Sequence, residues 1–278
     1  MADGNEERKI EILHPEVWSL SVRLSDKRLQ YALYSRLEDN SLIYGTINYP
    51  NTTNNYLKEL EAAVYDNSFF LLQYERVQFL VESSHFVLVP DEFSCEGNQQ
   101  ECERYFRFLY PESGETVLVD RIADAGLSVV YGVDAAVEAF LRRTFYNPPV
   151  NHFLTPIVKY FRSKDNYGNS KMYVFLNEGK AEVVVMKNRK VVCANYFAYK
   201  TVDDAFYFLM NAWKQNGLDP LKHELHIVGD KEVRKQLLPK LREYIANVIQ
   251  LIFPAQLLRL GKDAMVAPFD LIVLPLCE

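Results

Sequence analysis

Residues 171–204 read KMYVFLNEGKAEVVVMKNRKVVCANYFAYKTVDD. This stretch alternates β-rich runs with short polar turns: the runs are 172–176, 181–186 and 190–199, and the turns are 177–180 and 187–189. Short polar turns between such runs are typical of an antiparallel meander. A capping-box pattern follows, because Thr201 supplies a hydroxyl and Asp204 supplies a carboxylate three residues later. The sequence therefore predicts a helix after the third strand.

The same order of elements begins near the N-terminus, about 150 residues earlier. Its strands are predicted at 20–24, 28–36 and 42–47, and a short amphipathic helix is predicted after the N-cap-rich residues 51–55. The two copies share almost no residues, so the repeat is one of pattern rather than of sequence. We interpret it as a structural duplication, and the alternative is a pair of unrelated meanders.

The remaining segments complete two lobes. Further strands are predicted at 77–81, 86–89, 117–121, 127–131, 225–228 and 269–274, and further helices at 134–145 and 231–248. Pro239 either kinks the last helix or starts a second one. The clearest break in the chain is Asn147-Pro148-Pro149, because proline cannot continue a helix and restricts the residue before it. We therefore expect an α/β protein with mixed sheets, divided into an N-terminal lobe, 1–149, and a C-terminal lobe, 150–278.

This duplicated order of meander, helix and strand units resembles the actin-like ATPase superfamily. Its members include actin, sugar and acetate kinases, heat-shock chaperone ATPases and the actin-like cytoplasmic component of type IV pilus assembly. Segments 86–93 and 130–134 and the terminal Cys277-Glu278 look most like an uncharacterised bacterial family of that superfamily. The resemblance implies a duplicated actin-like, ribonuclease H-like fold that covers most of the chain.

The resemblance also implies where a nucleotide would bind, and this chain departs from the superfamily's pattern at each element. One hairpin turn in each lobe of the superfamily contacts phosphate, and its carboxylate organises a metal-bound water. The residues at the corresponding places are Asp26 in the first turn, Asn177, Glu178 and Gly179 in the second turn, and Gly229 and Asp230 in the adenosine turn. The first turn lacks its glycine, Asn177 replaces an aspartate that hydrated magnesium would favour, and Asp230 replaces a second glycine. These departures argue against phosphoryl transfer, which depends on positioning and electrostatic stabilisation.

Each of these turns also has a purely structural interpretation. Asp26 suits a hairpin turn, Gly179 supplies a positive φ angle, and Asp230 can cap the helix that follows it. The sequence therefore favours a non-catalytic actin-like module without a cofactor, which binds an unidentified protein partner at its inter-lobe cleft or outer face. The alternative is a divergent ATPase or small-molecule kinase that takes ATP and magnesium through Asp26, Glu178 and Asp230. A third hypothesis is a structural subunit that forms a homodimer through aromatic strands.

Composition and charge limit the classes of partner. The chain has 278 residues, and its net charge of −6, with 31 Lys+Arg against 37 Asp+Glu, gives no electrostatic footprint for nucleic acid. Its 11 glycines include no G-x-G arrangement, which excludes a P-loop and a dinucleotide-binding turn. No apolar run approaches the roughly 18–20 residues of a transmembrane helix, and the acidic start does not resemble a signal peptide. We expect a soluble cytoplasmic protein with reduced cysteines, because 4 cysteines are too few for a disulfide scaffold.

Two further features are candidates for a site. His223 and His226 have H-x-x-H spacing, but a strand would place them on opposite faces, and no nearby cysteine completes a zinc site. Segments 105–110 and 196–199 carry aromatic side chains at both strand parities. These aromatics are either inter-domain core or a surface for a protein partner.

Overall fold

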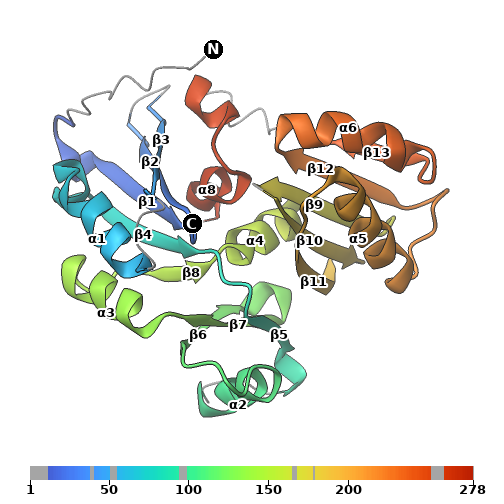
Figure 1. Cartoon of the computed structure of the whole chain (residues 1–278), viewed down its shortest axis with the longest axis horizontal. Helices are drawn as coiled ribbons and strands as arrows, with labels where there is room; N and C mark the ends of the chain where they lie inside the picture. Colours follow the sequence, from blue (N-terminus) through green and yellow to red (C-terminus); the bar gives the residue numbers. More distant parts are fainter. Residues whose placement is uncertain are drawn as a thin grey trace.

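The computed structural model describes residues 12–37, 41–50, 55–93, 99–164, 168–177, 179–251 and 260–277. The described strands form three sheets (Figure 1). The first sheet has the order β3-β2-β1-β4-β8 and consists of β1 (Trp18–Leu24), β2 (Arg28–Ser35), β3 (Ile43–Asn48), β4 (Arg76–Val81) and β8 (Val150–His152). The second has the order β11-β10-β9-β12-β13 and consists of β9 (Lys171–Asn177), β10 (Lys180–Lys187), β11 (Lys190–Ala198), β12 (Glu224–Gly229) and β13 (Asn247–Gln250). The third has the order β5-β7-β6 and consists of β5 (Phe86–Pro90), β6 (Thr116–Ile122) and β7 (Leu127–Val133).

The two five-stranded sheets are built in the same way. In each, an antiparallel meander comes first in the chain, and its first strand then pairs in parallel with a later strand. A further parallel strand completes the order, β8 in the first sheet and β13 in the second. This shared order confirms the predicted duplication and the predicted α/β class with mixed sheets. We call the first and third sheets with their helices the first lobe, and the second sheet with its helices the second lobe.

The α-helices are α1 (Tyr56–Tyr65), α2 (Gln99–Leu109), α3 (Ala135–Thr144), α4 (Leu154–Lys164), α5 (Val202–Gln215), α6 (Lys231–Arg242) and α8 (Phe269–Val273). Short 3-10 turns occur at Pro15–Val17, Ser68–Leu71, Asp91–Phe93, Ala123–Ala125, Lys262–Met265 and Leu274–Leu276. The predicted capping box of α5 is present, with the Thr201 hydroxyl accepting from the Asp204 backbone N–H and the Asp204 carboxylate accepting in return. Asp134 caps α3 by accepting from Ala136 and Val137 backbone N–H groups. Among the helices in the described ranges, none is long and apolar enough to cross a membrane.

Both meanders bury their alternating apolar residues against a helix. In the first lobe, Leu20 and Val22 of β1 belong to one core cluster with Leu60 of α1. In the second lobe, Val183 of β10 belongs to a cluster with Leu209 of α5. Each lobe therefore has its own apolar core, and burial of these side chains stabilises the folded lobe.

The aromatic segment 105–110 is helical, so the strand parity assigned to it is wrong. Residues 105–109 belong to α2, where Cys102 and Phe106 are buried at i and i+4, while Phe108 is 85% exposed. A helix places residues i and i+4 on one face, so Phe106 lies on the buried face of α2 and Phe108 on its exposed face. Segment 196–198 is in β11, as expected, and its aromatics are partly buried.

The C-terminal segment also differs from its prediction. Residues 269–273 form α8 instead of a strand, and all of them are buried between the two lobes (Figure 1). Because α8 is surrounded by protein, its residues are apolar at almost every position and show no helical period. The predicted helix 231–248 ends at Arg242 with Pro239 inside it, and Val248 belongs to β13.

The connection between the lobes runs through residues 147–164. β8 starts at Val150, directly after Asn147-Pro148-Pro149, and pairs in parallel with β4 of the first sheet. α4 follows it and lies in the centre of the molecule, where Ile157 and Phe161 share a core cluster with Phe175 of the second sheet (Figure 1). The division of the chain at residue 149 stays a prediction.

Candidate functional site

The turns that the sequence marked as phosphate elements lie against each other, one from each lobe. The first turn joins β1 to β2, and the second joins β9 to β10. Lys180 Nζ donates to Asp26 Oδ1 at 2.8 Å. Arg28, the first residue of β2, donates from Nη2 to Oδ1 of Asn177, the last residue of β9, at 3.1 Å. The two turns are therefore joined directly, by an ion pair and by a charge-assisted hydrogen bond.

Behind these turns, the guanidinium of Arg23 is buried among carboxylates from both lobes. Arg23 lies on β1, and its side chain is 2% exposed. It donates from Nη1 to Glu82 Oε2 at 2.7 Å, from Nη2 to Glu182 Oε1 at 3.0 Å, and from Nε to Asp270 Oδ2 at 2.6 Å. Glu82 follows β4, Glu182 lies on β10, and Asp270 lies on α8. One arginine thus connects the first sheet, the second sheet and the C-terminal helix.

Lys180 extends the same network to the surface. Its Nζ donates to Glu82 Oε1 at 2.6 Å as well as to Asp26. Glu82 therefore accepts from Arg23 on one oxygen and from Lys180 on the other. Tyr196 donates to that second oxygen at 3.3 Å. We call Arg23, Asp26, Glu82, Lys180, Glu182 and Asp270 the ionic clasp.

The pKa values within the clasp shift in opposite directions. Burial opposes ionisation of Glu82, but the charges and hydrogen bonds of Arg23 and Lys180 outweigh it and lower the pKa of this carboxyl. Burial raises the pKa of Glu182 well above its usual range, and the nearby charges of Glu82 and Asp270 raise it further against the effect of Arg23. Burial also disfavours the charged form of Lys180, yet Glu82 and Asp26 raise its pKa. Glu82 and Lys180 are thus an ionised pair, whereas Glu182 favours its protonated form.

The third predicted element, at Gly229 and Asp230, lies beside the second turn. Asp230 N–H donates to Leu176 O at 2.9 Å, at the end of β9. Gly229 has a φ angle of 105°, and a Cβ atom there would lie 1.9 Å from Leu176 O, so only glycine fits. Asp230 caps α6, accepting from the N–H groups of Glu232 at 2.9 Å and Val233 at 3.1 Å. Its cap role agrees with the structural interpretation of this residue.

A cavity of about 640 Å³ lies between the lobes next to these elements. Of the predicted site residues, Asn177, Gly229 and Asp230 line it. Asp26 and Gly179 are not among its lining residues; Asp26 lies beside Lys180, and Gly179 has a φ angle of 77°, as its turn requires. Glu178 lies outside the described residues. The basic side chains along the cavity wall are Arg23, Arg28, Lys231 and Arg234.

The sequence prediction missed most of the ionic clasp. Arg23 sits between Val22 and Leu24 in β1, and such alternation with apolar residues is typical of a side chain that faces solvent. Glu182 stands inside the apolar run of β10. The signal in the sequence is a charged residue inside each of two apolar strands, Arg23 in β1 and Glu182 in β10. Because buried charges are paired, two such residues of opposite sign indicate a buried ion pair.

The remaining candidates have structural roles. His223 Nδ1 accepts from the Asp219 N–H at 2.8 Å, and His226 Nε2 is 2.8 Å from Glu224 Oε2. No group of His, Cys, Asp and Glu that could hold a metal ion occurs among the described residues. Cys102 is disulfide-bonded, which the expectation of reduced cysteines did not foresee.

Comparison with solved structures shows an actin-like ATPase fold. The chain superposes on a protein of unknown function with this fold from Bacteroides thetaiotaomicron with a TM-score of 0.83 and 20% identity, covering 96% of this chain and 100% of that one. It superposes on a chain of the PilM-PilN type IV pilus biogenesis complex with a TM-score of 0.59 and 11% identity, covering 95% and 100% of the two chains. No curated protein matches the chain in sequence. The model of the family described as "Protein of unknown function (DUF3822)" matches residues 7–248, and the chain belongs to that family.

Proposed function

We propose that this protein is a non-catalytic actin-like module that binds a protein partner. The observation that carries the proposal is the direct contact between the two hairpin turns, Lys180 to Asp26 at 2.8 Å and Arg28 to Asn177 at 3.1 Å. In an actin-like ATPase, phosphate lies between these turns. Here the ammonium of Lys180 and the guanidinium of Arg28 lie between them, so the chain's own cations complete the interaction that links the lobes.

The same contacts are a poor fit for magnesium and ATP. The Asp26 carboxylate already accepts from Lys180, and Glu82 is engaged by both Lys180 and Arg23. Neither carboxylate is left to orient a metal-bound water without breaking an ion pair. Phosphoryl transfer requires such groups to be positioned in advance, and we therefore propose no turnover.

A protein partner is supported by the fold neighbours. The PilM-PilN type IV pilus biogenesis complex contains a chain of this fold bound to another protein. Binding of a protein partner is also compatible with a chain whose two lobes are joined across the cleft by its own side chains. A cytoplasmic location and homodimer formation remain predictions.

The second candidate function is a divergent ATPase or small-molecule kinase. The inter-lobe cavity favours it, because Lys231 and Arg234 would attract an anion beside Gly229. On this hypothesis the clasp would open to admit the ligand, and Asp26 would be needed for turnover.

Thermal unfolding with and without millimolar magnesium and ATP distinguishes the two. A ligand at about 100–1,000 times its dissociation constant stabilises the folded state by about 3–4 kcal/mol. We expect no shift for the wild-type protein and no phosphate release above background. A clear upward shift that Gly179→Val abolishes, or phosphate release that Asp26→Asn abolishes in a folded protein, would overturn the proposal.

A further inference from the structure

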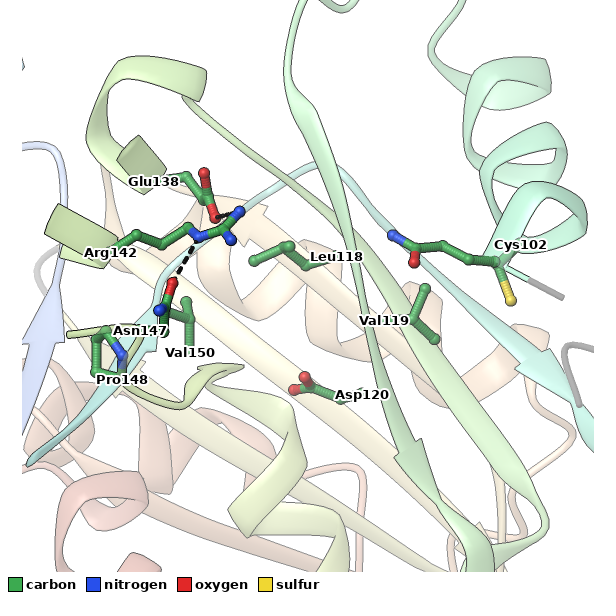
Figure 2. A pocket seen from close by; sticks show the side chains of 10 residues that line it. Cys102, Leu118, Val119, Asp120, Glu138, Arg142, Asn147, Pro148 and Val150 are labelled. Atoms are coloured by element: carbon green, nitrogen blue, oxygen red, sulfur yellow. Dashed lines mark hydrogen bonds and ion pairs between the residues drawn. The ribbon is translucent and has the colours of Figure 1, made fainter. Parts of the chain in front are cut away.

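A second cavity, of about 650 Å³, lies within the first lobe and away from the ionic clasp. It is bordered by Gln99 and Cys102 of α2, by residues 118–120 of β6, by Glu138 and Arg142 of α3, and by Asn147, Pro148 and Val150. Figure 2 shows Cys102 on one side of β6 and Arg142, Asn147 and Val150 on the other. We call this cavity the β6 groove.

The groove runs along the edge of a sheet. Successive side chains of a strand point to opposite faces, so a cavity over one face of a sheet would touch every second residue. The β6 groove touches Leu118, Val119 and Asp120 in succession. Sheet order agrees, because β6 pairs with β7 on one side and no described strand pairs with its other side. Main-chain N–H and C=O groups of β6 therefore face the groove.

The two faces of the groove differ in composition. On one face, Val119 packs at the cluster that contains Cys102 of α2. On the other face, Leu118 and Val150 pack at the main core cluster of the first lobe. A strand added beside β6 would alternate its side chains between these two apolar walls.

Four of the polar side chains that border the groove, those of Asp120, Glu138, Arg142 and Asn147, are already engaged. Asp120 accepts from Asn151 Nδ2 at 3.1 Å, from the His152 N–H at 2.7 Å, and from the Thr155 hydroxyl. On the rim, Arg142 pairs with Glu138 at 3.4 Å and donates from Nε to Asn147 Oδ1 at 2.9 Å. The groups that the groove offers to a ligand are thus main-chain hydrogen-bonding groups flanked by apolar walls.

We propose that the β6 groove binds an extended segment of a protein partner, which adds to β6 as a further strand. This proposal rests on the proposed function and gives it a place and a chemistry. A segment in β conformation supplies alternating N–H and C=O groups to the β6 edge and apolar side chains to both walls. Residues 118–120 extend over about 10 Å, at roughly 3.3 Å per residue. A second copy fits less well, because its β6 is flanked by the same α2 and α3.

The test uses synthetic peptides selected from a random display library on the intact protein. We expect selected peptides with alternating apolar residues, and binding should protect amide groups of residues 116–122 from hydrogen exchange. The peptides are then N-methylated at single positions. Only alternate residues of an added strand bond to the sheet edge, so methylation at one parity should weaken binding about ten-fold or more, and at the other parity about two-fold or less.

A pair of protein variants tests the location. Val119→Lys places a charge in the groove, and Val192→Lys places the same charge on β11, the edge strand of the second sheet, where Val192 is 48% exposed. We expect Val119→Lys to abolish peptide binding and Val192→Lys to leave it unchanged, with circular dichroism confirming that both variants fold. The N-methyl series keeps the test valid should Val119→Lys fail to fold.

Several results would overturn the inference: no selected peptide that binds, protection outside residues 116–122, N-methylation effects without parity, or self-association of the chain through β6. None of these results depends on nucleotide. Stabilisation by magnesium and ATP would instead overturn the proposed function, so the two failures are distinguishable.

Discussion

Replacement of Arg23 by methionine should destabilise this protein more than any exposed arginine substitution. Methionine keeps an unbranched side chain of similar length and removes the guanidinium that contacts Glu82, Glu182 and Asp270. The carboxylates then remain buried, with exposed side-chain fractions of 2–3%. Removing one partner of a buried ion pair leaves an uncompensated charge, which costs far more than the pair itself contributes.

The magnitude follows from this burial. Breaking a buried pair from one side costs about 3–5 kcal/mol, and for a chain of this size each kcal/mol lowers Tm by roughly 2–4 °C. We therefore expect Arg23→Met to lose about 3–5 kcal/mol of unfolding free energy and roughly 6–20 °C in Tm.

Urea unfolding at neutral pH, followed by circular dichroism, measures the change. The matched control is Arg143→Met, since the Arg143 side chain is 74% exposed and lies 3.9 Å from Glu61. An exposed pair of this kind is worth about 0–1 kcal/mol. A double variant, Arg23→Met with Glu82→Gln, should recover part of the loss, because it removes the cation and one of the buried anions together.

Unfolding of Arg23→Met and Arg143→Met at the same urea concentration would show that the buried guanidinium is not needed for stability. A Glu82→Gln change that adds to the loss of Arg23→Met instead of reducing it would show that the two residues act independently. Independent residues have additive effects on stability, whereas members of one buried network do not.

Four further predictions concern single positions. Glu182→Gln should gain stability relative to wild type as pH rises above 4.5, the ordinary pKa of the carboxyl, because the raised folded-state pKa favours the protonated form and that contribution is lost at higher pH. Glu82→Gln should behave oppositely, because the pKa of Glu82 is lowered in the folded state: the variant loses stability at neutral pH, and the loss shrinks as pH falls below 4.5. Urea titrations from about pH 3 to about pH 8 would record both changes. Gly229→Ala should lower the urea midpoint strongly or prevent folding, because its Cβ would lie 1.9 Å from Leu176 O, whereas Gly168→Ala, with no atom within 4 Å, should not. Asp230→Ala should lower the free energy of unfolding by about 1 kcal/mol, because α6 loses its cap, and Asp230→Asn should restore most of that stability. A much larger loss that Asp230→Asn does not restore would contradict the cap role of Asp230.

The sequence predicted the strands of both meanders because their apolar runs and polar turns are local signals. Asn55 and Thr201 cap helices where the pattern placed them. The prediction was wrong where a segment has no polar and apolar faces to distinguish. α8 is buried on all sides, so the apolar residues 269–274 do not distinguish a short helix from a strand. Residues 105–110 carry aromatic side chains at both strand parities, and only the spacing of Cys102 and Phe106 at i and i+4 indicates a helix there.

The candidate site was predicted only in part, because its contacts join residues far apart in the chain. Asp26 and Asn177 were identified as turn residues, yet their partners Lys180 and Arg28 follow from how the lobes meet. Arg23 and Asp270 are 247 positions apart, and no local pattern relates them. The sequence does show that Arg23 is a charged residue inside an apolar strand. Such a residue predicts a buried partner of opposite charge, but it does not indicate which residue that partner is.

The ionic clasp bears on how a protein of this fold would change shape. A ligand between two lobes shifts their equilibrium only by its differential affinity for the closed arrangement, and moving a population from 1:99 to 99:1 takes about 5.5 kcal/mol. Arg23 and Lys180 are part of the chain, so their interactions are present at all times and no ligand has to supply them. Arg23 binds carboxylates of the first sheet, the second sheet and α8, so separating the lobes would break these ion pairs whether or not nucleotide is present. Arg23→Met should then also widen the distribution of inter-lobe distances in small-angle scattering, at urea concentrations below the unfolding transition. An unchanged scattering profile would mean that α4 and α8, and not the clasp, fix the lobes.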